Sequence, residues 1–275
     1  MAWWRFPGLW GMSRLPAAAV AVMIIALEGG AVACPTGPVE TVQVAEVISA
    51  TELRLADGRR IRLAQLLIEP AAAGESAARI AAAAQRSVAE AVAQVGGRLA
   101  IRTLAARPDR HGRIPANVET PGRGGGWLQG RLVESGLAQV SALLDDPTCI
   151  GDLLRREAAA RSERRGLWST EIGTIWQAGD PGALAARTGH FAIVEGRIVS
   201  VGERRRRTYL NFGVNWVEDF TVLIEADDLP RLQAAGLVVG DLEGRWVRVR
   251  GWIRDDRGPA IRITHPGQLD IVGTR

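Results

Sequence analysis

Residues 41–64 contain the pattern that decides the fold, TVQVAEVISATELRLADGRRIRLA. Apolar and polar residues alternate through Thr41–Ile48 and again through Glu52–Leu55, which predicts two β-strands. Asp57-Gly58 is a strong signal for a hairpin turn, so Arg60–Leu63 is predicted to form the strand after the turn. This stretch therefore predicts an antiparallel hairpin preceded by a further strand.

The next hundred or so residues mix helical and strand patterns. Ser76–Val95 is predicted to be an alanine-rich helix, because apolar residues recur there at helical spacing until Gly96-Gly97. Ile114–Val118 has the composition of a strand, a short helix is predicted from Trp127, and Ile150–Arg164 again has helical spacing. The sequence up to residue 169 thus predicts a mixed domain of strands and helices.

The last part of the chain is rich in strand patterns. Residues 170–189 contain Gly179, Pro181 and Gly182 and are predicted to be a linker. A short helix is predicted at Leu229–Ala235. Five strands are predicted around it: Ala192–Val201, Tyr209–Phe212, Phe220–Ile224, Trp246–Ile253 and Ala260–Thr264. Strands in this order fit a second, OB-like β-barrel over residues 190–275.

The composition excludes several classes of protein. The chain has 275 residues, with 34 basic side chains that are all arginine, 30 acidic ones and 47% hydrophobic residues. These values rule out a disordered chain, a collagen, a coiled coil and a scaffold of many disulfides. The net charge of +4 is spread evenly along the chain, so no domain has the basic excess of a protein that coats duplex DNA.

Residues 1–33 have the pattern of a secretory signal peptide. Arg5 and Arg14 precede the apolar run Ala17–Leu27, and Ala31-Val32-Ala33 forms a small-residue cleavage site. The apolar run is shorter than the roughly 20 residues of a membrane-spanning helix. We therefore expect an exported protein, periplasmic or secreted, whose mature chain begins at Cys34. A lipid anchor on Cys34 and an uncleaved N-terminal anchor are the alternatives.

The chain has two cysteines, Cys34 and Cys149. Export makes a disulfide between them feasible, and two unpaired thiols are the equally weighted alternative, because spacing alone does not show proximity. Neither a CxxC motif nor a His/Cys cluster is present in the sequence, so no zinc site is expected.

Several short segments, in order, carry a resemblance to a known family: Arg60-Ile61-Arg62-Leu63-Ala64, Gly74-Glu75-Ser76-Ala77, Asp109-Arg110-His111-Gly112-Arg113, Trp127-Leu128-Gln129, Gly136-Leu137-Ala138, Glu157 with Arg161, and Gly166-Leu167-Trp168. In this order and spacing they resemble the thermonuclease family, the staphylococcal nuclease-like domains. The resemblance implies that residues 34–169 form an OB-like five-stranded barrel with three flanking helices. The expected fold class is thus mainly β with helices (α+β).

The resemblance also implies a chemistry. The family cleaves phosphodiesters with calcium, which carboxylates hold because a hard cation takes several oxygen ligands. A glutamate assists the attacking water, and two arginines neutralise charge on the phosphoryl group. By position, Arg62 and Arg113 match those two arginines.

The carboxylates of the family do not carry over. Its Asp-Gly-Asp-Thr turn is replaced here by Ser49-Ala50-Thr51-Glu52, its second aspartate by Leu67 or Ile68, and its glutamate by Pro70 or Ala71. Glu52 and Glu69 are near enough to substitute, each displaced by about one residue. Such a displacement in a strand sends a side chain to the opposite face, so Glu52 substitutes only if a bulge restores its direction.

In the second barrel, candidate nucleic-acid contacts are Tyr209 and Trp216, which would stack on bases, and Arg205 and Arg206, which would contact phosphates. The alternative is that aromatic residues of this half fill its core, as we expect for Phe220 and Trp246.

These patterns predict an exported nuclease-like protein with a degenerate metal site, which binds nucleic acid or another anionic ligand with weak or no hydrolysis. One alternative is an active calcium-dependent endonuclease that uses Glu69, and Glu52 as a further ligand. The other is a non-catalytic envelope protein that binds a protein or glycan partner.

Overall fold

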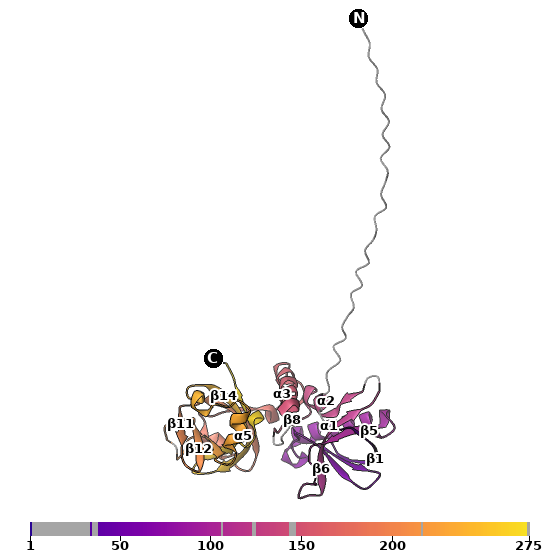
Figure 1. Cartoon of the computed structure of the whole chain (residues 1–275), viewed down its shortest axis with the longest axis horizontal. Helices are drawn as coiled ribbons and strands as arrows, with labels where there is room; N and C mark the ends of the chain where they lie inside the picture. The colour runs from indigo at the N-terminus through magenta and orange to yellow at the C-terminus, as the bar shows by residue number, and fades with distance from the viewer. Residues whose placement is uncertain are drawn as a thin grey trace. The chain divides into compact units, whose positions relative to one another are not determined.

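The computed structural model describes residues 1, 34, 38–105, 107–122, 125–142, 147–215 and 217–273 (Figure 1). The residues Ala33–Arg275 cluster as one compact unit. The predicted signal peptide lies outside the described residues, apart from Met1, and it stays a prediction. Among the described residues, no helix combines the length and the apolar character that crossing a membrane requires.

The first sheet is a closed barrel of five strands. Its strands follow the path β3-β2-β1-β5-β6, and a parallel pairing of β3 with β6 closes the ring. The bounds are β1 Glu40–Ser49, β2 Glu52–Leu55, β3 Arg60–Leu63, β5 Arg98–Thr103 and β6 Arg113–Thr120, and β7 Gly126–Trp127 extends the sheet beside β6. The predicted OB-like barrel is therefore confirmed.

Alternation along these strands builds the core of the barrel. Leu53, Ile61 and Leu99 are completely buried, while the residues on either side of each are turned outward or partly exposed. Three helices accompany the barrel: α1 Glu75–Gln94, α2 Leu128–Glu134 and α3 Pro147–Ser162. Ala84 and Val88 of α1 lie in the barrel's core cluster, which explains the apolar stripe at helical spacing in this alanine-rich segment. A short two-stranded sheet pairs β4 (Leu66–Leu67) with β8 (Gln139–Val140).

The second half repeats the strand order of the first. The path is β11-β12-β13-β15-β14-β10-β9. β10 and β11 belong to one continuous segment, Phe191–Glu203, which pairs with β14 at one end and with β12 at the other and so completes a ring, with β9 added beside β10. As in the first barrel, the third and last strands of the ring, β13 and β15, are parallel. The bounds are β9 Ile175–Gln177, β10 Phe191–Arg197, β11 Ser200–Glu203, β12 Arg207–Asn211, β13 Thr221–Glu225, α5 Leu229–Ala234, β14 Trp246–Asp255, β15 Pro259–Arg262 and β16 Leu269–Ile271.

Two details differ from the expected elements. The single strand expected at Ala192–Val201 is split into β10 and β11, because Ile198 and Val199 turn their backbone N–H groups to Arg245 and Asn211. The segment 170–189, predicted as a linker, contains β9 and the short helix α4 (Pro181–Ala185). β9 pairs in parallel with β10, so part of this segment is built into the second sheet. Five short 3₁₀ segments complete the assigned elements: Ala71–Ala73, Gly166–Ser169, Glu171–Gly173, Val239–Leu242 and Pro266–Gln268.

A buried ion pair connects the two halves. Glu157 of α3 and Arg250 of β14 are almost fully buried, and Nη2 of Arg250 lies 2.8 Å from Oε2 of Glu157. Nη1 of Arg250 also donates to Oε1 of Glu157 at 3.1 Å and to the backbone oxygen of Val140 at 2.9 Å. Glu157 accepts a further hydrogen bond from the backbone N–H of Val140 at 2.8 Å. Both charges are therefore compensated away from water, and Glu157 has a second, more distant cation in Arg161, whose Nη1 lies 3.8 Å from its Oε2.

Two glycines let the ends of α2 and α3 touch through their backbones. Gly136 and Gly166 have φ values of +67° and +52°, which favour glycine. A Cβ on Gly136 would lie 2.1 Å from the backbone oxygen of Arg165, and one on Gly166 would lie 2.3 Å from that of Gly136. The N–H of Leu167 donates to the same Gly136 oxygen at 2.8 Å. Neither position has room for a side chain.

A disulfide joins Cys34 to Cys149 of α3, with Cα atoms 5.1 Å apart and 115 residues of sequence separation. Both cysteines lie in the core cluster of the first barrel. The bond therefore fixes the start of the predicted mature chain to the third helix.

Replacing Arg250 with alanine is expected to lower the free energy of unfolding by about 3 kcal/mol, because the buried Glu157 would lose its nearer cation and keep only Arg161, whose Nη1 lies 3.8 Å from Oε2. Arg254, exposed on the same strand, is the matched control, and its alanine variant should change stability by less than about 0.5 kcal/mol. Urea denaturation followed by circular dichroism measures both. Equal stability of the two variants would contradict the role given to the ion pair.

The double variant Cys34→Ser/Cys149→Ser is expected to lose about 2–4 kcal/mol of stability, because the bond closes a long loop and restricts the unfolded chain. Urea denaturation of the oxidised native protein and of the variant provides the comparison. Two thiols that react with a labelling reagent in the native, unreduced protein would refute the disulfide.

Candidate functional site

The outer face of the first barrel brings three arginines together. In β3, Ile61 points into the core, so Arg60 and Arg62 point outward. β3 pairs in parallel with β6 in a register that sets Arg60 beside Arg113. We call Arg60, Arg62 and Arg113 the arginine face.

Glu52 lies on this same face. Its Cα is the registered partner of Arg62 across the β2–β3 pair, and directly paired residues share a face. The register between β1 and β2 is irregular between Val44 and Glu46 and between Val47 and Ser49, which is the kind of bulge that the direction of Glu52 was expected to need. The Glu52 carboxylate accepts a hydrogen bond from Nε of Arg60 at 2.6 Å and lies 3.7 Å from Nη1 of Arg113.

The turn that starts β6 is organised by Asp109. Its Oδ1 accepts from the backbone N–H groups of His111 and Arg113 at 2.8 and 3.0 Å. Its Oδ2 accepts from Nε and Nη2 of Arg113 at 3.0 and 2.8 Å. Gly112 completes the turn at φ +75°. Burial raises the pKa of Asp109, but these hydrogen bonds outweigh it and hold that pKa well below its usual range.

Arg62 differs from its neighbours because it has no counter-ion of its own. It is half-buried, and the described residues provide it with neither a hydrogen bond nor an ion pair. Burial, followed by repulsion from Arg113, lowers the pKa of Arg62, while Asp109 and Glu52 partly offset that shift. Arg62 is thus a partly desolvated cation beside a second one, which favours an anionic ligand.

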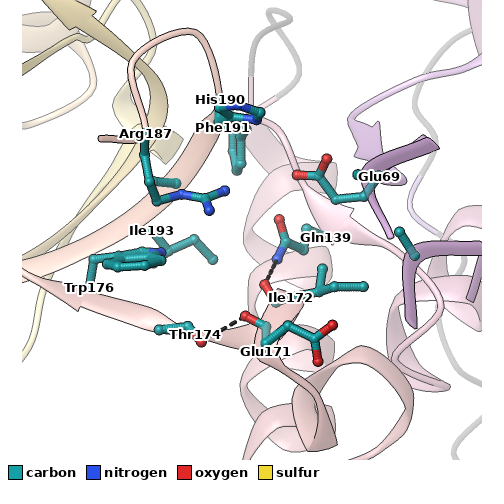
Figure 2. A pocket seen from close by; sticks show the side chains of 13 residues that line it. Glu69, Gln139, Glu171, Ile172, Thr174, Trp176, Arg187, His190, Phe191 and Ile193 are labelled. Carbon is teal, nitrogen blue, oxygen red and sulfur yellow. Dashed lines mark hydrogen bonds between the residues drawn. The ribbon is translucent and has the colours of Figure 1, made fainter. Parts of the chain in front are cut away.

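Glu69 belongs to another part of the structure. It is half-buried and lines a pocket with Gln139, Trp176 and Arg187 (Figure 2). The structure records no contact between Glu69 and either Arg62 or Arg113. The sequence predicted Glu69 as a candidate substitute for a missing carboxylate of the site. In the structure its recorded neighbours are the residues of this pocket.

The side chains present do not fit a calcium ion. The Glu52 carboxylate is held by Arg60 and Arg113, and Asp109 uses both of its oxygens within its own turn. The family's second aspartate position, Leu67 or Ile68, is apolar, and both residues pack against hydrophobic clusters. Within the described ranges, no three His, Cys, Asp or Glu side chains are grouped as a metal ion needs.

Sequence reasoning missed Arg60 as a member of the site. Arg60 and Arg62 are two residues apart in a strand, so the alternation of side chains already placed them on one face. Arg60 donates to the carboxylate of Glu52 and, at 3.2 Å, to the backbone oxygen of His111. These contacts depend on pairings between strands, which no local sequence pattern reveals.

The residues of the second half that were predicted to contact nucleic acid do not lie together in one site. Tyr209 of β12 lines an open groove of about 480 Å³ with Arg207, Asn211 and Thr221. Arg207, which the sequence analysis did not select, lies 6.0 Å from the Tyr209 ring and pairs with Glu225 and Asp256.

The other five aromatic and basic residues that the sequence singled out in this half have different outcomes. Arg205 and Arg206 are exposed in the β11–β12 turn and do not line the groove, although Arg204 and Arg207 on either side of them do. Trp216 lies outside the described residues. Phe220 is completely buried in the core cluster of this half, as expected, whereas Trp246 is half-buried.

Comparison with known proteins shows a family likeness within the first half. Residues 68–170 match the family model described as "Staphylococcal nuclease homologue". The match includes Glu69, Asp109 and Arg113 but not Glu52 or Arg62. No curated protein matches the chain. With the closed five-stranded barrel, the family match shows a staphylococcal nuclease-like, OB-like region.

The low pKa of Asp109 predicts a pH-dependent contribution to stability. Because the folded state holds this pKa below the unfolded value of about 4, the contribution is present above that pH and is lost as the pH falls toward the folded pKa. The melting temperature of Asp109→Asn should therefore lie below that of the native protein at pH 7, and the gap should narrow in acid. Asp270→Asn, at an exposed site in β16, should show no such gap. A gap for Asp109→Asn that is constant with pH would count against this assignment.

Proposed function

We propose that the staphylococcal nuclease-like region binds the phosphodiester backbone of a nucleic acid, or a similar anion, at the arginine face, with weak or no hydrolysis. The observation that carries the proposal is Arg62, a half-buried guanidinium without a counter-ion beside Arg113. A phosphate would supply the missing negative charge, and the planar fork of a guanidinium matches two phosphate oxygens. The match to the nuclease family model supports nucleic acid as the polyanion.

The carboxylates of the site support binding over cleavage. Glu52 is held between Arg60 and Arg113, where it neutralises part of the positive charge that would attract a phosphate. Its Oε1 faces Arg60 and its Oε2 faces Arg113, so neither oxygen is well placed to take a proton from an attacking water. The alternative of an active endonuclease requires Glu69 to reach the arginine face, and its position in a different pocket does not support that.

The second barrel offers a further contact for a strand. Tyr209 and Arg207 lie in the groove over β12 and β13, beside the loop between β14 and β15 that holds Asp256. Oligonucleotides and oligosaccharides bind to this part of many OB-folds. We include the groove in the proposal as a secondary site. The envelope interaction protein is the remaining alternative, and it requires neither of the two sites to bind nucleic acid.

We also propose that the mature protein works outside the cytoplasm. The signal-like pattern of residues 1–33 and the Cys34–Cys149 disulfide support this location, because disulfides persist in oxidising compartments.

Two substitutions on the arginine face should change affinity in opposite directions. Arg62→Ala is expected to weaken binding of a fluorescent single-stranded oligonucleotide by about tenfold to a hundredfold, because a charge-assisted hydrogen bond is lost. Glu52→Gln should strengthen binding, because it removes a competing negative charge. Fluorescence anisotropy over a range of salt concentrations measures both, with Arg98→Ala, an exposed arginine on β5, as the matched control. The slope of log affinity against log salt should fall by about one unit in Arg62→Ala.

A cleavage assay separates the three candidate functions: the native protein and Glu69→Gln are each incubated with a labelled oligonucleotide, with and without calcium, and the cleaved fraction is measured. Weak cleavage that is indifferent to Glu69→Gln agrees with the proposal. Rapid calcium-dependent cleavage that is abolished by Glu69→Gln establishes the active endonuclease instead. A lack of both binding and cleavage leaves the interaction protein.

A further inference from the structure

The pocket that contains Glu69 is separate from the arginine face and has a chemistry of its own (Figure 2). It is a cavity of about 180 Å³, bounded by residues from β8, from the segment Glu171–Arg187 and from β10. Since a water molecule occupies about 30 Å³ of liquid, the cavity has room for about six waters or one small molecule.

Arg187 supplies the positive side of this pocket. Its guanidinium carbon lies 5.0 Å from the centre of the Trp176 ring, so the cation rests on an aromatic face. Its Nε is buried without a hydrogen-bond partner, and the described residues provide no ion pair for its charge. The stacked guanidinium is thus held in a fixed plane, and Figure 2 shows it directed into the pocket. A planar donor fork of this kind fits a carboxylate.

The opposite side of the pocket accepts hydrogen bonds. Figure 2 shows the carboxylate of Glu69 and the amide of Gln139 directed toward the same space as Arg187. The amide nitrogen of Gln139 donates to the backbone oxygen of Ile172 at 3.2 Å, which leaves its side-chain oxygen as an acceptor. Glu69 has no recorded partner among the described residues. The other carboxylate, Glu171, is engaged by Ser76, whose Oγ donates to it at 3.2 Å.

Apolar side chains form the remaining walls. Phe191 and Ile193 of β10 are buried, and with Ile172 they form a hydrophobic cluster beside the charged groups. The pocket therefore combines one fixed cation, one acceptor pair and an apolar surface within a small volume.

We propose that this pocket binds a free α-amino acid with an apolar side chain. The carboxylate of the ligand would pair with Arg187, its ammonium group with Glu69 and the Gln139 oxygen, and its side chain would contact Ile172, Phe191 and Ile193. A partly buried charge costs free energy unless an opposite charge compensates it, and a zwitterion compensates both at once. A nucleobase has matching donors and acceptors but no formal charge, so it would leave both Glu69 and Arg187 uncompensated. Charge complementarity thus selects the amino acid.

Isothermal titration calorimetry of the mature protein with three probes tests the ligand. L-leucine is expected to bind in a saturable manner at one site. L-leucinamide lacks the carboxylate and N-acetyl-L-leucine lacks the ammonium group, so each should bind at least about tenfold more weakly. Absence of leucine binding at millimolar concentration, or equal binding of all three probes, would overturn the proposal. Binding of guanosine 5′-monophosphate in place of leucine would also overturn it and identify a nucleotide pocket.

Two conservative variants test the residues. Glu69→Gln keeps the shape of the side chain and removes its charge, and Arg187→Lys keeps the charge and removes the planar fork. Each should weaken leucine binding at least about tenfold, while Glu90→Gln, at an exposed position of α1, should leave it unchanged. Oligonucleotide binding at the arginine face should stay at the native level in Glu69→Gln. Native leucine affinity in both variants would refute the assigned contacts.

Discussion

The ion pair between Glu157 and Arg250 is the interaction on which the arrangement of the described chain depends. It lies where α3 of the first barrel meets β14 of the second, away from water, and it also fixes both backbone polar groups of Val140. Removal of Arg250 leaves the buried Glu157 with only the longer ion pair to Arg161, and removal of Glu157 leaves the buried Arg250 without its recorded counter-ion, so the two barrels are not independent in their energetics.

Charge compensation also explains the difference between the two candidate sites. On the arginine face, Glu52 and Asp109 satisfy most of the positive charge from within, and Arg62 is the one member of that face whose charge has no recorded internal partner. In the pocket that contains Glu69, the carboxylate of Glu69 and the guanidinium of Arg187 lie on opposite sides of a space, and each lacks a partner among the described residues. The first site is therefore suited to a polymer of one sign of charge, and the second to a small ligand that carries both.

Most of the elements could be predicted from the sequence, whereas the surroundings of the site residues could not. Alternation and the Asp57-Gly58 turn predicted the hairpin, and helical spacing predicted α1, because these signals are local. The direction of Glu52 depends on an irregular register in the partner strand, and the surroundings of Glu69 are supplied by residues about a hundred positions later. Arg250 and its partner Glu157 are 93 residues apart in the sequence. Such pairings are set by the tertiary fold and leave no periodic trace in the chain.

The contact between Gly136 and Gly166 has a genetic consequence. The atoms that would obstruct a side chain at either position belong to the main chain, which every amino acid shares. Shrinking a neighbouring residue therefore cannot create space, as it can inside a hydrophobic core. A search for suppressors of a substitution at either glycine should recover restored glycine codons and no compensating change elsewhere in the gene.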